Sequence, residues 1–404
     1  MSIIGIFALI TVASLTQELP THFSENDTVD QHPVIHHISV VSGFDYMASS
    51  VSDELREKED ISDKTSVHTS IPLHLKYSFS FTNPKIRNYL PGGYQGIGLS
   101  VLNLGATEAG GFSSACHNIG YPVSVYAFQG GPFWKIKRNL SLNYEWNFGA
   151  SFGWKPYLEA NENFNLTVGS RVNAYLNLNL SLMWKINKHS ALLGGLAVTH
   201  FSNGNTSWPN PGVNSFGIRI GYIWTINPQE KDFEPVESDT LKKRKVEFDI
   251  MGWGSSRKRV YKGGETPVLL PGHFACAGLS FAPMVRLGHW WRVGGSADIQ
   301  WDQSSDLKDN YVEGDTTDNI KFYRPSFWRQ VNAGISAHIE LQMPIFAVNI
   351  GIGYNLLSPS ENKGLYQNIS LKTYIGSKLF LNIGYQLRNF QQQSNLMLGL
   401  GITI

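Results

Sequence analysis

The chain has 404 residues and a formal net charge of +1, with 16% charged and 12% aromatic residues. The near-neutral balance excludes a broad basic surface, so nucleic acid is not expected as a partner. Beyond the N-terminus no run of about 20 apolar residues occurs, which excludes a protein that crosses a membrane with helices.

Residues 1–20 predict a signal peptide. Ile3–Leu15 is apolar, and polar residues follow directly after it. The usual basic start is missing, because no lysine or arginine precedes Arg56. A buried N-terminal strand is the alternative interpretation of the same stretch.

Strict alternation begins at Leu140–Trp154, where every second residue is apolar over the whole segment. A period of two places all apolar side chains on one face of an extended strand. Such a strand is longer than strands of soluble proteins usually are, and it is long enough to cross a bilayer at a tilt.

The segment 173–184 repeats the pattern, with leucines on one face and mainly asparagines on the other. A transmembrane barrel turns such leucines to lipid and the asparagines to its interior. Trp154 and Trp184 stand near strand ends, where barrels carry a girdle of aromatic residues at the membrane interface. Glu145 is expected to face the interior, in an ion pair with a basic group such as Arg171 or Arg219.

Strands of this kind continue to Ile404, with about eight before Asn227 and about eight after Lys243. The expected organisation is a barrel half at 30–227, a charged linker at 228–242 and a second strand half at 243–404. The fold class is therefore all-β, an antiparallel transmembrane barrel. One barrel of about 16 strands is favoured over two eight-stranded barrels in tandem. The two cysteines, Cys116 and Cys276, have no pairing pattern, so a disulfide and two free thiols both stay open.

The candidate chemistry lies at the end of the segment Leu192–Ser202. Its apolar face leads on to His200 and Ser202, which share one side of the strand two residues apart. Asn214 is the one polar residue on the corresponding face of the next strand, and an antiparallel hairpin would bring it near His200. A hydroxyl, an imidazole and a group that orients the imidazole are what nucleophilic ester hydrolysis needs.

The stretch THFSNGNTSWPNPGVNS (199–215) resembles the active-site signature of the PagL-type lipid A 3-O-deacylases, most closely the long Bacteroidetes forms called acyloxyacyl hydrolases. The segments YEWNFGASFGWKP and GSRVNAYLN extend this resemblance over residues 70–227. It implies Ser202 as nucleophile, His200 as general base and Asn203 as an oxyanion donor. Asn214 stands where the compact enzymes have a glutamate, so this chain departs from the pattern there.

The resemblance implies an outer-membrane serine esterase, a carboxylic ester hydrolase that removes an ester-linked acyl chain from lipid A. Lipopolysaccharide and other outer-membrane lipids are the expected partners, and no metal or cofactor is implied. A channel or a barrel that has lost the chemistry is the alternative, because Asn214 replaces the glutamate and the second half is extra. A soluble lectin-like β protein is a third and weaker possibility.

Overall fold

A computed structural model describes part of the chain. The described residues are 34–50, 65–82, 92–105, 120–156, 168–228, 246–261, 268–288, 290–307, 311–312, 320–343, 346–357, 363–376, 378–390 and 392–404. The predicted signal peptide, Cys116 and all but the first residue of the predicted linker lie outside them. Within them, no helix has the length and apolar sequence that crossing a membrane would require.

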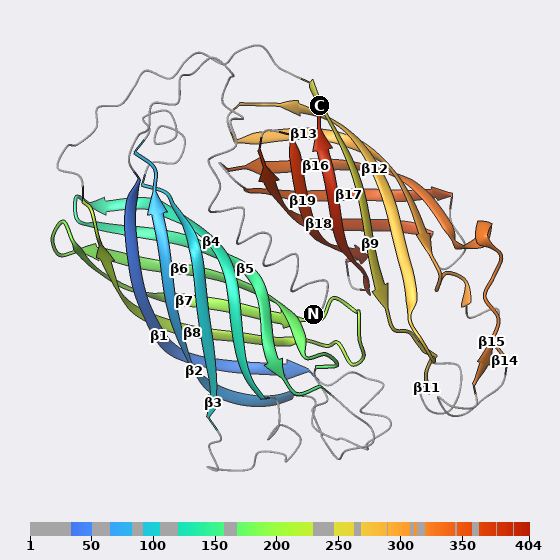
Figure 1. The fold of residues 1–404 in the computed structure, drawn as a ribbon, viewed down its shortest axis with the longest axis horizontal. Helices are drawn as coiled ribbons and strands as arrows, with labels where there is room; N and C mark the ends of the chain where they lie inside the picture. The colour runs from blue at the N-terminus through green and yellow to red at the C-terminus, as the bar shows by residue number, and fades with distance from the viewer. Residues whose placement is uncertain are drawn as a thin grey trace.

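The first barrel is built from eight antiparallel strands, each paired with the next along the chain (Figure 1). Pairing of the last strand with the first closes it. These strands are β1 (Ile35–Ser50), β2 (Thr65–Ser80), β3 (Tyr94–Gly105), β4 (Gly120–Lys137), β5 (Leu140–Trp154), β6 (Val172–Lys185), β7 (Ser190–Ser202) and β8 (Val213–Thr225).

The second barrel also has eight strands and closes where its last strand pairs with its first. Its strands are β9 (Val246–Arg257), β12 (Phe274–Arg286), β13 (Trp291–Asp302), β16 (Val331–Gln342), β17 (Phe346–Leu357), β18 (Gly364–Ile375), β19 (Leu379–Arg388) and β20 (Gln392–Thr403). Its longer connections hold two short hairpins and a 3-10 helix, which are β10 (Val260–Tyr261) with β11 (Val268–Leu269), β14 (Tyr311–Val312) with β15 (Lys321–Phe322), and η3 (Phe327–Gln330).

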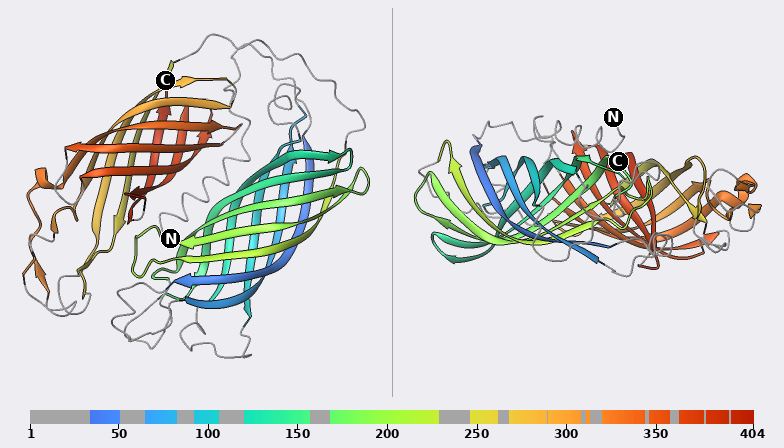
Figure 2. Two further views of the ribbon diagram at one scale, coloured as in Figure 1. Left: turned by 180° about the vertical axis from the view of Figure 1, so that it is seen from behind. Right: turned by 90° about the horizontal axis from the view of Figure 1, so that it is seen from below.

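The predicted class, an all-β antiparallel barrel, is confirmed, and the tandem arrangement is the one that forms. The favoured single barrel of about 16 strands does not form. Each half closes on itself, because the edge of β1 is taken by β8 before the chain reaches the second set of strands. The two barrels lie side by side (Figures 1 and 2).

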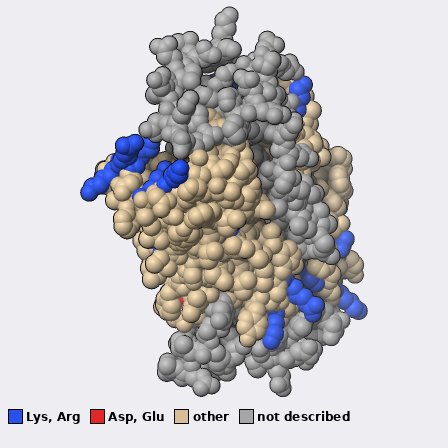
Figure 3. Space-filling view, turned by 60° about the vertical axis from the view of Figure 1, so that its left-hand side comes forward, with Lys and Arg blue, Asp and Glu red and all other residues tan. Residues whose placement is uncertain are grey.

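The outward faces carry the apolar side chains that the alternation predicts. On β6, Leu178 is 58% exposed, whereas Asn177 on the opposite face is 5% exposed. In Figure 3 the middle of one face is free of charged side chains, and lysines and arginines lie towards its ends and edges. An apolar band between polar ends is how a barrel meets a bilayer. Trp184, at 51% exposed, stands at one end of β6 as predicted for the interfacial girdle.

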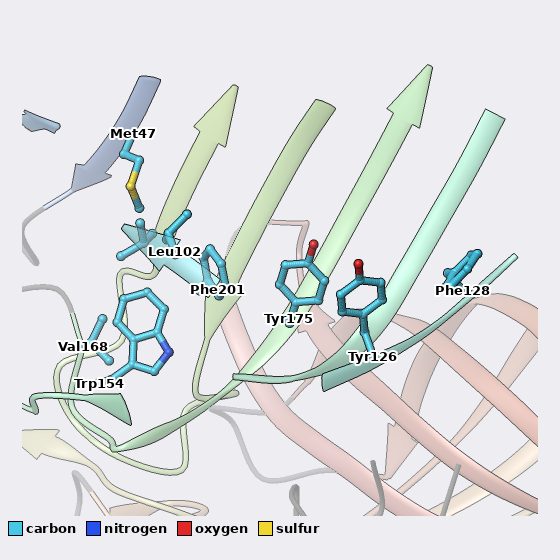
Figure 4. Close-up of a cluster of buried hydrophobic side chains, with 9 residues drawn as sticks. Met47, Leu102, Tyr126, Phe128, Trp154, Val168, Tyr175 and Phe201 are labelled. Carbon is cyan, nitrogen blue, oxygen red and sulfur yellow. The ribbon is translucent and has the colours of Figure 1, made fainter. Parts of the chain in front are cut away.

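The interior of the first barrel is closed towards one end by aromatic side chains (Figure 4). Trp154 belongs to this cluster and is 2% exposed, so its predicted place in the outer girdle is wrong. The reason is local: Gly153 has a φ of +85°, which breaks the alternation at the end of β5. The cluster consists of Met47, Leu102, Tyr126, Phe128, Trp154, Val168, Tyr175, Phe201 and Val213.

Buried ion pairs also lie in the first interior. Glu145 faces inward and pairs with a basic group as predicted, and the group is Lys76, at 2.5 Å, in place of the two arginines given as examples. Arg219 pairs with Asp45 instead. A cavity of about 710 Å³ lies between these pairs and the far end of the barrel.

A charged network lies in the second interior, and the buried pair Arg257–Asp302 lies in the same barrel. Arg292 is fully buried and bonds to Glu340 at 2.8 Å and to Asp249 at 2.7 Å. Lys372 bonds to the same two carboxylates, each at 2.6 Å. Buried charges need such partners, because isolation from water is costly. A cavity of about 40 Å³ lies beside the network.

Candidate active site

The candidate residues lie at one end of the first barrel, where β7 ends and β8 begins. The chain makes long connections at this end, including 155–171 and 203–212. At the opposite end it makes short turns at 138–139 and 186–189, together with the longer connection 81–93. Outer-membrane barrels keep short turns on the periplasmic side and longer loops outside, so the two short turns predict that the rim with the candidate residues faces the cell exterior.

His200 and Asn214 are brought together as the hairpin pattern predicts. They are directly opposite each other in the β7–β8 ladder. The Nδ1 of His200 and the Oδ1 of Asn214 are 2.7 Å apart. An amide oxygen only accepts, so Nδ1 carries the hydrogen and donates it, and Nε2 is left with a free lone pair. The ring is therefore held in the tautomer that a general base requires.

Ser202 shares the outward face of β7 with His200, and both side chains are half-buried. No direct hydrogen bond joins these two side chains in the described part of the chain. Gly212 marks how close they lie: a Cβ added to it would stand 3.0 Å from His200 Cε1 and 3.6 Å from Ser202 Cβ. The imidazole and the serine thus lie on either side of the position that a Cβ of residue 212 would occupy. This position is empty because residue 212 is a glycine.

Asn203 is buried and ties the 203–212 loop together. Its backbone N–H donates to Asn210 Oδ1 at 2.9 Å, and its Nδ2 donates to the Pro209 carbonyl at 3.2 Å. One Nδ2 hydrogen remains for another acceptor. Ser207 Oγ fastens the loop to the β5–β6 connection by donating to the Gly169 carbonyl at 2.7 Å.

Reasoning from the sequence missed two contributors to this rim. Gly212 could have been noticed, because a glycine directly before a strand commonly has a positive φ, and here φ is +78°. The contribution of the second barrel could not have been noticed, because no local sequence pattern predicts that its strand β20 contacts the loop. A Cβ added to Gly204 would meet Leu396 of that strand at 3.1 Å.

A closed antiparallel barrel with a lipid-facing apolar band and a polar, charge-paired interior defines an outer-membrane β-barrel protein. Two family models match this chain. The model described as "Lipid A 3-O-deacylase (PagL)" matches residues 73–223, and the one described as "Acyloxyacyl hydrolase, C-terminal domain" matches residues 246–404. Together they match well over half of the chain. The chain belongs to the PagL lipid A 3-O-deacylase family, and its place is the outer membrane.

Comparison with curated proteins finds no match. Among solved structures, the chain is similar to Neisserial surface protein A, at 9% identity and a TM-score of 0.30, over 47% of this chain and 97% of that one. It is also similar to the COG4313 outer membrane channel from Pseudomonas putida F1, at 12% identity and a TM-score of 0.18, over 94% of this chain and 98% of that one.

Proposed function

We propose that the protein is an outer-membrane serine esterase that removes an ester-linked acyl chain from lipid A at the rim of its first barrel. The observation that carries the proposal is the His200–Asn214 hydrogen bond on the lipid-facing surface, with Ser202 on the same face of β7. This polar pair continues the apolar outward face of its two strands, which is the side on which an esterase acting on a membrane lipid needs its base and its nucleophile.

The proposed reaction begins with Ser202 Oγ attacking the carbonyl carbon of the ester, while the hydroxyl proton passes to His200 Nε2. The tetrahedral intermediate then collapses, and the sugar oxygen leaves with that proton. Water, deprotonated by the same Nε2, attacks the acyl-enzyme and releases the fatty acid. Asn203 is proposed to donate its remaining Nδ2 hydrogen to the oxyanion.

Asn214 can orient the imidazole but cannot stabilise its charged form as a carboxylate would. We therefore expect slower turnover than a glutamate at this position would give. The hydrogen bond to Nδ1 supports retention of the chemistry, because the ring keeps the tautomer that accepts a proton at Nε2.

The interiors support an enzyme over a channel. In the first barrel the aromatic cluster fills one end of the lumen, and in the second the Arg292 network crosses it. A conducting pore needs a continuous water-filled path. The lipid substrate, in contrast, would approach along the outer wall and need not enter either lumen.

The test is mass spectrometry of lipid A from cells that express the wild type, Ser202→Ala or Ser190→Ala. Ser190 is a matched control, since it lies at the other end of the same strand, bonded to the Tyr222 hydroxyl at 2.8 Å. We expect lipid A to lose one hydroxyacyl mass with the wild type and Ser190→Ala only. Unaltered lipid A in all three strains would overturn the function in favour of a non-enzymatic barrel, and cleavage by Ser202→Ala would overturn the assignment of the nucleophile.

A further inference from the structure

The second barrel packs against the wall of the first through apolar side chains. Ala150 of β5 is fully buried in a cluster with Ile383, Leu396 and Leu398 of the second barrel. Further along the same contact, Trp146 meets Phe346 edge to face, with ring centroids 5.4 Å apart. The outward side chains of β5 are therefore half-buried or buried, whereas most of those on β6, β7 and β8 are exposed.

The same contact continues onto the loop that follows Ser202. The Gly204 backbone rests against Leu396, and the Asn205 carbonyl accepts a hydrogen bond from the Lys258 N–H at 3.4 Å. Two neighbouring residues of the loop thus contact the second barrel, one at β20 and the other just after the end of β9.

These contacts bear directly on the geometry around Ser202. Gly204 is two residues from the serine, has a φ of +65° and leaves no room for a side chain beside Leu396. Asn210 accepts the Asn203 N–H, so a shift of Asn210 would move the residue next to Ser202. Leu396 itself is held in the packed cluster between the barrels, which makes it a rigid support.

We propose that the second barrel positions the catalytic loop, with Leu396 as the positioning residue for Ser202. This inference rests on the proposed esterase function. It gives the second half of the chain a role in the reaction of the first, because Leu396 fixes the backbone after the nucleophile. A displacement of about 1 Å at a reacting group can cost about 100-fold in rate.

Disulfide cross-linking tests the attachment of the loop without any need for activity. In the full-length Cys116→Ser protein in detergent micelles, Asn205→Cys and Lys258→Cys should form a disulfide on mild oxidation. The native Cys276 is buried and should not interfere. Asn205→Cys with Lys188→Cys is the control, because Lys188 lies in the turn at the opposite end of β7, and this pair should not cross-link. Failure of the first pair to react would overturn the inference.

Steady-state kinetics test the positioning. Leu396→Ala should lower kcat about tenfold with KM within about twofold of wild type, since the chemical geometry is disturbed while the lipid-binding wall is not. Leu396→Met should restore most of the rate. Leu400→Ala is the matched control, because Leu400 points outward from the same strand and is 51% exposed. The folded fraction, read from heat-modifiable gel migration, normalises each rate.

The outcomes separate the two proposals. An active wild type with equal kcat in Leu396→Ala and Leu400→Ala would overturn the positioning role and leave the esterase intact. A lower folded yield with unchanged kcat per folded molecule would show that Leu396 acts on stability alone and would also overturn it. An inactive wild type would remove the proposed function, and the positioning role with it, whatever the cross-link shows.

Discussion

Gly212 is the residue on which the geometry around His200 depends most closely. Gly212→Ala would place a methyl group 3.0 Å from His200 Cε1 and 2.8 Å from the Phe201 carbonyl oxygen. We expect kcat to fall at least about tenfold while the barrel still folds, because the imidazole must move away from Ser202. Kinetics on purified protein measure this.

The control for Gly212→Ala is Gly272→Ala. Gly272 also has a positive φ, +83°, but no atom lies within 4 Å of its added Cβ. The two variants therefore share backbone strain and differ in the steric contact. Equal activities would show that the space above Gly212 is not needed by the imidazole.

Substitutions at Asn214 are expected to lower or to raise kcat, depending on the side chain introduced. Asn214→Leu keeps the approximate size and removes the acceptor for His200 Nδ1, so kcat should fall by about 100-fold, since an incorrect tautomer is costly. Asn214→Asp adds a charge that stabilises the imidazolium and should raise kcat above wild type. The measurement is the rate of lipid A deacylation at neutral pH for the wild type, Asn214→Leu and Asn214→Asp. A wild-type rate in Asn214→Leu would exclude Asn214 from the site.

Among the elements, β13 carries the residue that holds the second interior together. Arg292→Met removes the cation between Glu340 and Asp249, leaving carboxylates that Lys372 alone must neutralise. We expect a loss of about 3–5 kcal/mol in the free energy of unfolding, the range for breaking a buried ion pair. Urea unfolding followed by tryptophan fluorescence would measure it.

Arg286→Met is the comparison for this change. Arg286 lies at the edge of the same network, paired with Glu247, and its side chain is 27% exposed. A partly exposed pair contributes about 0–1 kcal/mol, so this variant should unfold near the wild-type midpoint. Similar losses in both variants would contradict a network that depends on burial.

The elements also show what the sequence could and could not predict. The period of two predicted β5, β6 and the outward face of β7, because lipid and lumen impose alternation along each strand. The pattern failed for Trp154, where one glycine with a positive φ turned the side chain inward. It predicted a basic partner for Glu145 but could not identify it as Lys76, because that residue lies on β2, 69 residues away, and only the barrel brings the two together.

The same reasoning applies to the site and to the number of barrels. His200, Ser202 and Asn214 could be placed on one face because a hairpin relates them locally. The arrangement of two barrels could not be predicted, because strand alternation is identical in one barrel of 16 strands and in two of eight. The number of barrels depends on which strand pairs with the free edge of β1. That pairing is set by long-range contacts and by the curvature of the sheet.

At the scale of the whole molecule, the apolar band sets how deep the barrel sits in the membrane. Leu178 lies at the middle of β6, and Trp184 lies near its end. Arginine at Leu178 should lower the free energy of unfolding by about 2–4 kcal/mol, whereas at Trp184 the loss should be about 0–1 kcal/mol. Unfolding in lipid vesicles measures both variants. Equal losses of unfolding free energy in the two variants would show that the apolar band is not centred on Leu178.

The position of the rim has a further consequence for selectivity. Ser202 is half-buried on the outward face at the end of β7, at the rim that the short turns predict to face the cell exterior. With that orientation, an ester in the inner leaflet would lie a whole strand length away from the proposed nucleophile and would not reach it, whatever its chemistry. The asymmetry of the bilayer itself would then select the substrate, and turnover would depend on how many lipids per unit area diffuse past the rim. Loss of that asymmetry, with glycerophospholipids entering the outer leaflet, would expose the enzyme to esters that its position normally excludes.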